Sequence, residues 1–127
     1  MEIVRKITQE LAIVGQVTPE QLHDIANDGY KSILNLRFAD EKDWWEDEQK
    51  QTEDLGLSYA NIPIKFEELN PQISLEIFAV INQLPKPILI HCDNAIRSAA
   101  IVLLYIANKQ GIEFDQVWEQ NPKLFWF

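Results

Sequence analysis

The chain has 127 residues, enough to bury one hydrophobic core, and we expect one domain over residues 1–127. Its 20 acidic residues outnumber its 11 basic residues, a formal net charge of −9 that argues against a nucleic-acid partner. We expect no membrane association, because no apolar run approaches the length of a membrane span. The polar start of the sequence and the single cysteine lead us to expect the cytoplasm, a reducing compartment.

Strands and helices are expected to alternate along the chain. A first strand at 11–15 precedes a helix that Thr18 caps, with Pro19 at its first position and Gly29 at its end. Further strands are expected at 32–37, 58–64 and 87–91, and further helices at 40–54, 71–84, 97–111 and 114–120. The aromatic residues 125–127 are expected to pack back onto the body. This alternation predicts a three-layer α/β/α sandwich around a mostly parallel sheet of about four to five strands.

The most informative stretch follows the strand at 87–91. The apolar run stops at His91 and Cys92, and a buried helix begins near Arg97. Backbone N–H groups and the positive end of that helix favour a thiolate, which is the nucleophilic form of cysteine. The planar guanidinium of Arg97 suits two oxygens of an oxyanion. Since ligands of such sheets bind beyond the carboxyl ends of strands, the sequence predicts an anion-binding loop with a cysteine nucleophile.

The same stretch resembles the cysteine-dependent phosphatases of the dual-specificity and tyrosine type. The resemblance is closer to the small bacterial beta-lactamase-hydrolase-like phosphatase family, and it covers the segments 15–22, 33–37, 55–64 and 84–92. It implies a phosphatase-like fold, with Cys92 forming a cysteinyl-phosphate and Arg97 clamping the oxyanion. It also implies that the Ser98 hydroxyl assists the sulfur as a leaving group. We expect no cofactor, and no metal, because the cysteine and the two histidines lack a ligand spacing.

Three departures from the larger phosphatase pattern leave other functions open. Only four residues separate Cys92 from Arg97, whereas tyrosine and dual-specificity phosphatases have five and rhodanese-type sulfurtransferases commonly have four. Ala95 stands where many relatives carry glycine, and Asp93 places a negative charge beside the sulfur. The alternatives are sulfur transfer through a Cys92 persulfide, and a catalytically weak module that binds an anion or a partner.

A phosphatase also needs a carboxylic acid that protonates the leaving oxygen. Glu67 and Glu68, in the loop after the strand at 58–64, are the main candidates, and Asp40 and Glu41 are weaker ones. His91 is expected to order the loop rather than to act as a base.

The ligand is expected to be phosphate or another small oxyanion, and the substrate and oligomeric state stay open. Its binding loop is expected to comprise Asp93, Asn94, Ala95, Ile96 and Arg97. Arg37 either lines the same mouth as a second positive group or pairs with a nearby carboxylate. We expect the Asp93 side chain to point away from the mouth and to pair with Arg37 or Lys65, because it neighbours an inward-facing cysteine. In the alternative arrangement it faces the mouth and suppresses the binding of dianions relative to neutral or singly charged sulfur species.

Overall fold

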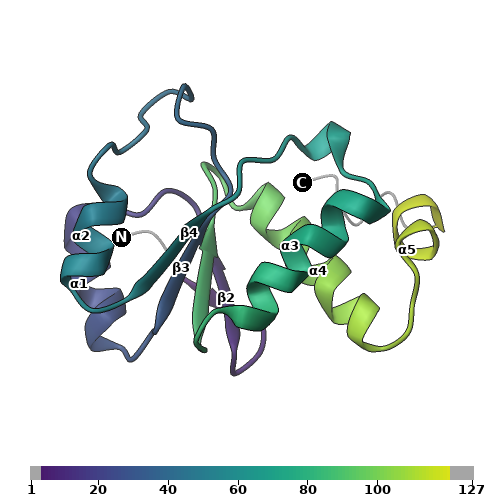
Figure 1. Cartoon of the computed structure of the whole chain (residues 1–127), viewed down its shortest axis with the longest axis horizontal. Coiled ribbons are helices and arrows are strands. Elements are labelled where there is room, and N and C mark those ends of the chain that lie inside the picture. The colour runs from purple at the N-terminus through teal and green to yellow at the C-terminus, as the bar shows by residue number, and fades with distance from the viewer. Residues whose placement is uncertain (1–3, 121–127) are drawn as a thin grey trace.

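The computed structural model describes residues 4–120, and its centre is a five-stranded sheet. The strands are β1 (Arg5–Lys6), β2 (Leu11–Val14), β3 (Ser32–Asn35), β4 (Ser58–Asn61) and β5 (Ile88–His91). Their spatial order is β1-β2-β5-β3-β4 (Figure 1). Strand β5 is parallel to both of its neighbours and β3 is parallel to β4, whereas β1 is antiparallel to β2. The mostly parallel sheet is confirmed.

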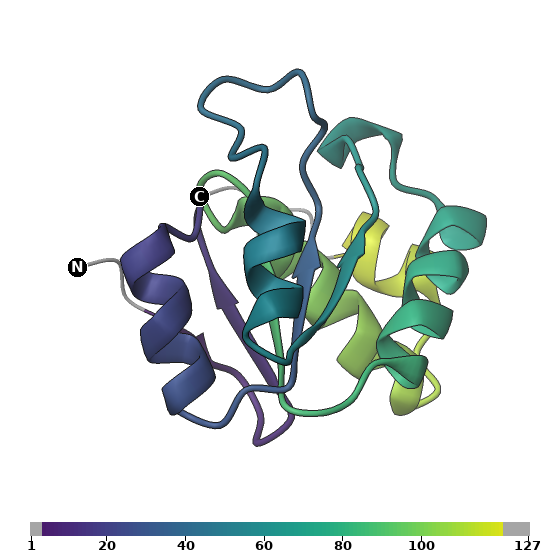
Figure 2. The ribbon, with the colours of Figure 1, turned by 60° about the vertical axis from the view of Figure 1, so that its left-hand side comes forward.

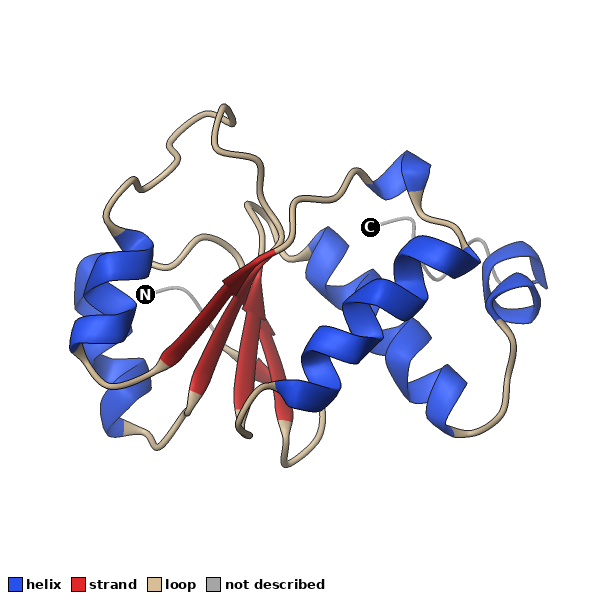
Figure 3. Cartoon of the chain, in the orientation of Figure 1, coloured by secondary structure: helices blue, strands red, loops and turns tan. Residues whose placement is uncertain are grey.

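Helices cover both faces of this sheet and complete three layers. In Figures 1 and 3, α1 (Pro19–Asn27) and α2 (Glu48–Asp54) lie on one face of the sheet. On the other face lie α3 (Pro71–Gln83) and α4 (Ile96–Lys109), and α5 (Phe114–Gln120) packs against α4. A short 3-10 helix, η1 (Phe66–Glu68), precedes α3. No helix within residues 4–120 is long and apolar enough to span a membrane.

The central strand β5 is buried on both faces. Ile88 and Ile90 face the core under α3 and α4, and Leu89 faces the smaller core under α1 and α2. This division follows from the two-residue period of a strand, which sends successive side chains to opposite faces. The strand is therefore fixed from both sides, and the position of the loop that follows it is fixed as well.

The cap of α1 is the one expected from the sequence. Thr18 accepts a hydrogen bond from the Gln21 backbone, and the Gln21 side chain accepts one from the Thr18 backbone. This reciprocal pair satisfies two N–H groups that the helix itself leaves free. The helix ends before Gly29, whose φ of 95° lies in the left-handed region.

The expected helix at 40–54 is wrong over its first half. Only Glu48–Asp54 is helical, and the preceding residues form a long loop that stands clear of the sheet (Figure 2). The Arg37 side chain donates hydrogen bonds to backbone carbonyls of this loop, at Lys42 and Asp43. Those carbonyls stabilise the loop conformation, in which Asp43 has a φ of 62°.

Other differences lie at element ends. The strands expected at 32–37 and 58–64 end earlier, at Asn35 and Asn61, and β1 was not predicted at all. Strand β4 is at the sheet edge, as expected from Pro63. The aromatic residues 125–127 lie outside the described residues.

Candidate active site

The loop between β5 and α4 is a tight turn at the carboxyl end of the central strand. Ala95 has a φ of 71°, in the left-handed region, and the helix begins at the next residue. The Asn94 side chain accepts a hydrogen bond from the Ile96 backbone at 3.2 Å, and the Ala99 backbone donates to the Ala95 carbonyl at 2.9 Å. The turn thereby brings Cys92 at the strand end close to the first turn of α4.

Cys92 lies at the bottom of this turn and is fully buried. Its Sγ accepts a hydrogen bond from the Ser98 hydroxyl at 3.3 Å, and Ser98 is itself buried in α4. A hydroxyl in this position can stabilise negative charge on the sulfur. Apolar residues of the α3 and α4 core surround the rest of the cysteine side chain.

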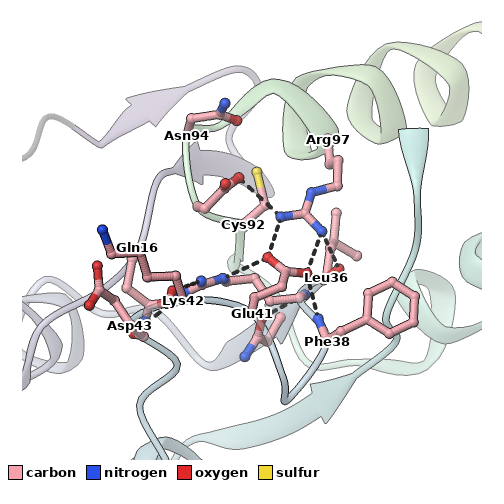
Figure 4. Close-up of polar contacts among 12 residues, drawn as sticks. Gln16, Leu36, Phe38, Glu41, Lys42, Asp43, Cys92, Asn94 and Arg97 are labelled. Carbon is pink, nitrogen blue, oxygen red and sulfur yellow. Dashed lines mark hydrogen bonds and ion pairs between the residues drawn. The ribbon is translucent and has the colours of Figure 1, made fainter. Parts of the chain in front are cut away.

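Arg97 points from α4 toward the loop that follows β3, next to Cys92 (Figure 4). Its two terminal nitrogens, Nη1 and Nη2, each donate to a carboxylate oxygen of Glu41 at 2.8 Å. Nη1 also donates to the Ile64 carbonyl at 3.2 Å, and Nη2 to Asp93 at 3.0 Å. Among the described residues, Nε has no partner. The guanidinium is therefore held firmly, and most of its donors are already engaged.

Glu41 is the residue that fixes Arg97. The hydrogen bonds from Arg97 are the largest cause that lowers the pKa of Glu41, to about 2, and the Phe38 backbone and Arg37 add to the effect. The same contact raises the pKa of Arg97. Glu41 is thus held as a carboxylate by two arginines, which argues against the weaker expectation that it donates a proton. Its four-residue distance from Arg37 was the one sequence signal for an ion-paired carboxylate.

Arg37 pairs with a carboxylate rather than lining the mouth of the loop. It is almost completely buried, and its Nε donates to Glu41 at 3.1 Å. Its remaining donors contact the Gln16 side chain and the loop carbonyls described above. Of the two expected roles for Arg37, the structure shows the pairing role.

Asp93 contacts neither Arg37 nor Lys65, so the expected pairing is wrong. Its partner is Arg97, four residues along the chain, whose Nη2 lies 3.0 Å from the Asp93 carboxylate. Arg37 is engaged by its internal partners, and Lys65 lies 3.9 Å from Glu68. The Asp93 carboxylate is half exposed, beside the guanidinium that would clamp an oxyanion.

His91 and Glu48 form a buried pair beneath the loop. The Nε2 atom of His91 lies 2.5 Å from Glu48, and Nδ1 lies 3.3 Å from the Cys92 carbonyl. Glu48, the first residue of α2, also accepts a hydrogen bond from Gln16 at 2.9 Å. Burial, and then the charge of Glu48, raise the pKa of Tyr59. Sequence reasoning missed Glu48, because it lies in an acidic stretch that we interpreted as a solvated face.

A surface cavity of about 310 Å³ opens beside the loop. Its walls are formed by Ile64, Lys65, Phe66, Glu67, Asp93, Asn94, Ile96 and Arg97. Of the two candidate acids, Glu67 lines the same cavity as Arg97, whereas Glu68 is outside these walls and lies 3.9 Å from Lys65. Cys92 is not part of the lining, so the loop separates the sulfur from the cavity in this structure.

Comparison with known proteins identifies the family. A family model described as "DSP-PTPase phosphatase fused to NAD+ Kinase" matches residues 5–120. The chain belongs to this family of phosphatases. No curated protein matches the chain.

Solved structures of phosphatases share the fold of this family member. A candidate phosphatase of Shewanella putrefaciens CN-32 is 23% identical, with a TM-score of 0.79 over 96% of this chain and 81% of that one. TpbA of P. aeruginosa, in a variant complexed with phosphotyrosine, is 11% identical, with a TM-score of 0.71 over 87% of this chain and 65% of that one. The core catalytic domain of the PP-IP phosphatase SIW14 of S. cerevisiae, in complex with citrate, is 16% identical, with a TM-score of 0.68 over 98% of this chain and 75% of that one. The expected cysteine-phosphatase-like fold is confirmed.

Proposed function

We propose that this member of the phosphatase family hydrolyses phosphate monoesters through a cysteinyl-phosphate on Cys92. The observation that carries the proposal is the meeting of three side chains at the carboxyl end of β5. The Ser98 hydroxyl donates to the Cys92 sulfur, and the Arg97 guanidinium lies next to Cys92 (Figure 4). A nucleophile, a group that stabilises it and a cation for the equatorial oxygens are the parts that phosphoryl transfer requires.

In the first step the Cys92 thiolate attacks phosphorus, and the bond from phosphorus to the leaving oxygen breaks. Glu67, on the cavity wall, gives that oxygen its proton. Arg97 and the backbone N–H groups of 93–95 hold the other phosphoryl oxygens. In the second step water attacks the phosphorus and gives a proton to the Glu67 carboxylate that the first step left. The sulfur leaves as a thiolate, and the Ser98 hydroxyl stabilises it.

The substrate approaches through the cavity beside the loop. Because Cys92 is buried and outside the cavity lining, attack requires the loop to shift and expose the sulfur. The ligands named for two structural neighbours, phosphotyrosine and citrate, support an oxyanion as the bound group. Phe66 and Lys65 also line the cavity, where they can contact the leaving group of the substrate.

The chemistry is tested by mass spectrometry of Cys92 after separate exposure to an aryl phosphate and to thiosulfate. We expect acid quenching to trap a phosphorylated Cys92, no adduct in Cys92→Ser, and little in Arg97→Ala. A persulfide from thiosulfate without any phosphorylated form would instead show a sulfurtransferase. Anion binding without either adduct would show a binding module with a phosphatase fold.

The acid is tested with a matched pair of variants. Glu67→Gln should slow hydrolysis of esters with poor leaving groups about 100-fold, because general acid catalysis is lost, and should spare esters with good leaving groups. Glu68→Gln, which removes the same charge at the next residue and outside the cavity lining, is the control. An equal loss in both variants would contradict the assignment of Glu67.

A further inference from the structure

We propose that Asp93 tunes the charge selectivity of the Cys92–Arg97 loop, weakening the binding of dianions more than the binding of singly charged oxyanions. The proposal rests on the proposed function only in taking this loop as the anion site. It concerns binding rather than turnover, so it can fail while the catalytic assignment stands.

The geometry places Asp93 where an oxyanion would bind. A guanidinium holds two oxygens best through two adjacent N–H groups. The edge formed by both Nη atoms of Arg97 faces Glu41, which is secured in turn by Arg37. The other edge is formed by Nε, which has no partner among the described residues, and by Nη2, which donates to Asp93 at 3.0 Å. An incoming oxyanion must displace the Asp93 carboxylate from Nη2 or bind directly beside it.

The charges around Arg97 are balanced before any ligand arrives. Glu41 lies between Arg97 and Arg37, so its charge is shared by two cations. The Asp93 carboxylate contacts only Arg97 among the described basic residues. The carboxylate belongs to the residue that follows the nucleophile, so it stays close to an anion in the loop even after it releases Nη2, and it repels that anion.

This repulsion depends on the charge of the ligand. Coulomb energy is proportional to the product of the charges, so one carboxylate opposes a dianion twice as strongly as a monoanion at the same position. Removal of the Asp93 charge should therefore change the two binding free energies in a ratio of about two to one. Simple competition for one hydrogen-bond donor would change both equally.

The test compares sulfate and methyl sulfate, which are both tetrahedral and carry two and one permanent charges. Each is titrated into the full chain, and the backbone N–H signals of 93–98 are followed by NMR. In Asp93→Asn we expect about a tenfold gain in sulfate affinity, about 1.4 kcal/mol, and about a threefold gain for methyl sulfate. Asp24→Asn, an exposed carboxylate on α1 with the same charge change, is the control and should alter neither affinity.

Each outcome separates this proposal from the proposed function. Unchanged affinities in Asp93→Asn, equal gains for both anions, or losses for both would overturn the charge-selection role and leave the catalytic residues unaffected. Failure of both anions to bind the wild-type loop would overturn this proposal and the anion site together. Because Asp93 is half exposed, Asp93→Asn should fold as the wild type does, and an unchanged melting temperature verifies this.

Discussion

The two faces of the sheet bury different chemistry at the end where Cys92 lies. Toward α3 and α4, strand β3 and the residue after it present Leu34 and Leu36 to an apolar core. Toward α1 and α2, the alternate positions of the same stretch carry Asn35 and Arg37, which are equally buried but hydrogen-bonded. Apolar packing is strong and non-directional, whereas buried hydrogen bonds fix orientation. One face therefore supplies most of the stability, and the other holds the loop residues in position.

The largest expected effect on stability comes from the apolar face. Ile81→Ala in α3 removes a fully buried side chain and should lower the free energy of unfolding by about 4 kcal/mol. Turnover per folded molecule should stay close to wild type, because Ile81 belongs to the apolar core and not to the polar face. Leu75→Ala, on the same helix but 57% exposed, is the control and should cost about 0.5 kcal/mol or less. Denaturant unfolding measures the stability of both variants, and rates normalised to the concentration of active sites measure their turnover. A loss of turnover in parallel with stability would contradict the division of roles.

The next effect concerns the polar face. Glu48→Ala leaves His91 and Gln16 without their shared partner, and it should lower the free energy of unfolding by about 3 kcal/mol. Unlike Ile81→Ala, it should also lower turnover of the folded molecules, since His91 contacts the Cys92 carbonyl. Glu53→Ala, exposed on the same helix, is the control. If stability falls and turnover does not, the buried pair serves the core alone.

A smaller effect should depend on pH. Because the folded pKa of Glu41 is lowered to about 2, its ionisation stabilises the fold fully above the unfolded pKa of about 4.3, and this contribution is lost as the pH falls through 2. At pH 6, Glu41→Gln should therefore be less stable than wild type by about 2 kcal/mol. The difference should shrink steadily below about pH 4.5. Urea unfolding at several pH values measures it, with the exposed Asp40→Asn as control; a difference that does not depend on pH would refute the linkage.

The smallest effect should come from the surface of the α1 layer. Thr18→Ala removes the side-chain cap of α1 and should cost about 1 kcal/mol. Turnover should be unaffected, because the cap contacts no residue of the buried polar network. Thermal unfolding and a rate assay test this together, and Thr18→Ser should restore most of the loss. A change in rate would mean that α1 itself helps to position the loop.

The sequence allowed the fold to be predicted wherever the signal was local. The apolar run before His91, the period of the helix after Arg97 and the capping residues of α1 identify their elements without long-range information. The roles of Glu41 and Glu48 were not predictable in this way. Glu41 meets Arg97 across 56 positions and Glu48 meets His91 across 43, and no local periodicity encodes such pairs.

The acidic stretch shows how composition misled the prediction. Its many carboxylates are typical of a solvated helix, yet two of them lie against a buried arginine and a buried histidine. Arg37 explains why the first half of the expected helix is a loop, since its side chain donates to the backbone carbonyls of Lys42 and Asp43, which a helix would have used internally. Polar residues at alternate positions at the end of a buried strand, here Asn35 in β3 and Arg37 just after it, are the signal that could have indicated buried partners.

Ala95 has a consequence for how often the loop opens. A residue with a Cβ in the left-handed region costs about 1 kcal/mol relative to its relaxed conformation, and glycine avoids this cost. The turn is thus maintained by its surroundings, chiefly by the hydrogen bonds that Arg97 donates to Glu41, and not by its own backbone preference. In hydrogen exchange the amides of 93–97 should open more readily than those of β5, and Ala95→Gly should slow their exchange several-fold. The exposure of Cys92, which the proposed reaction requires, would then depend on the methyl group of Ala95.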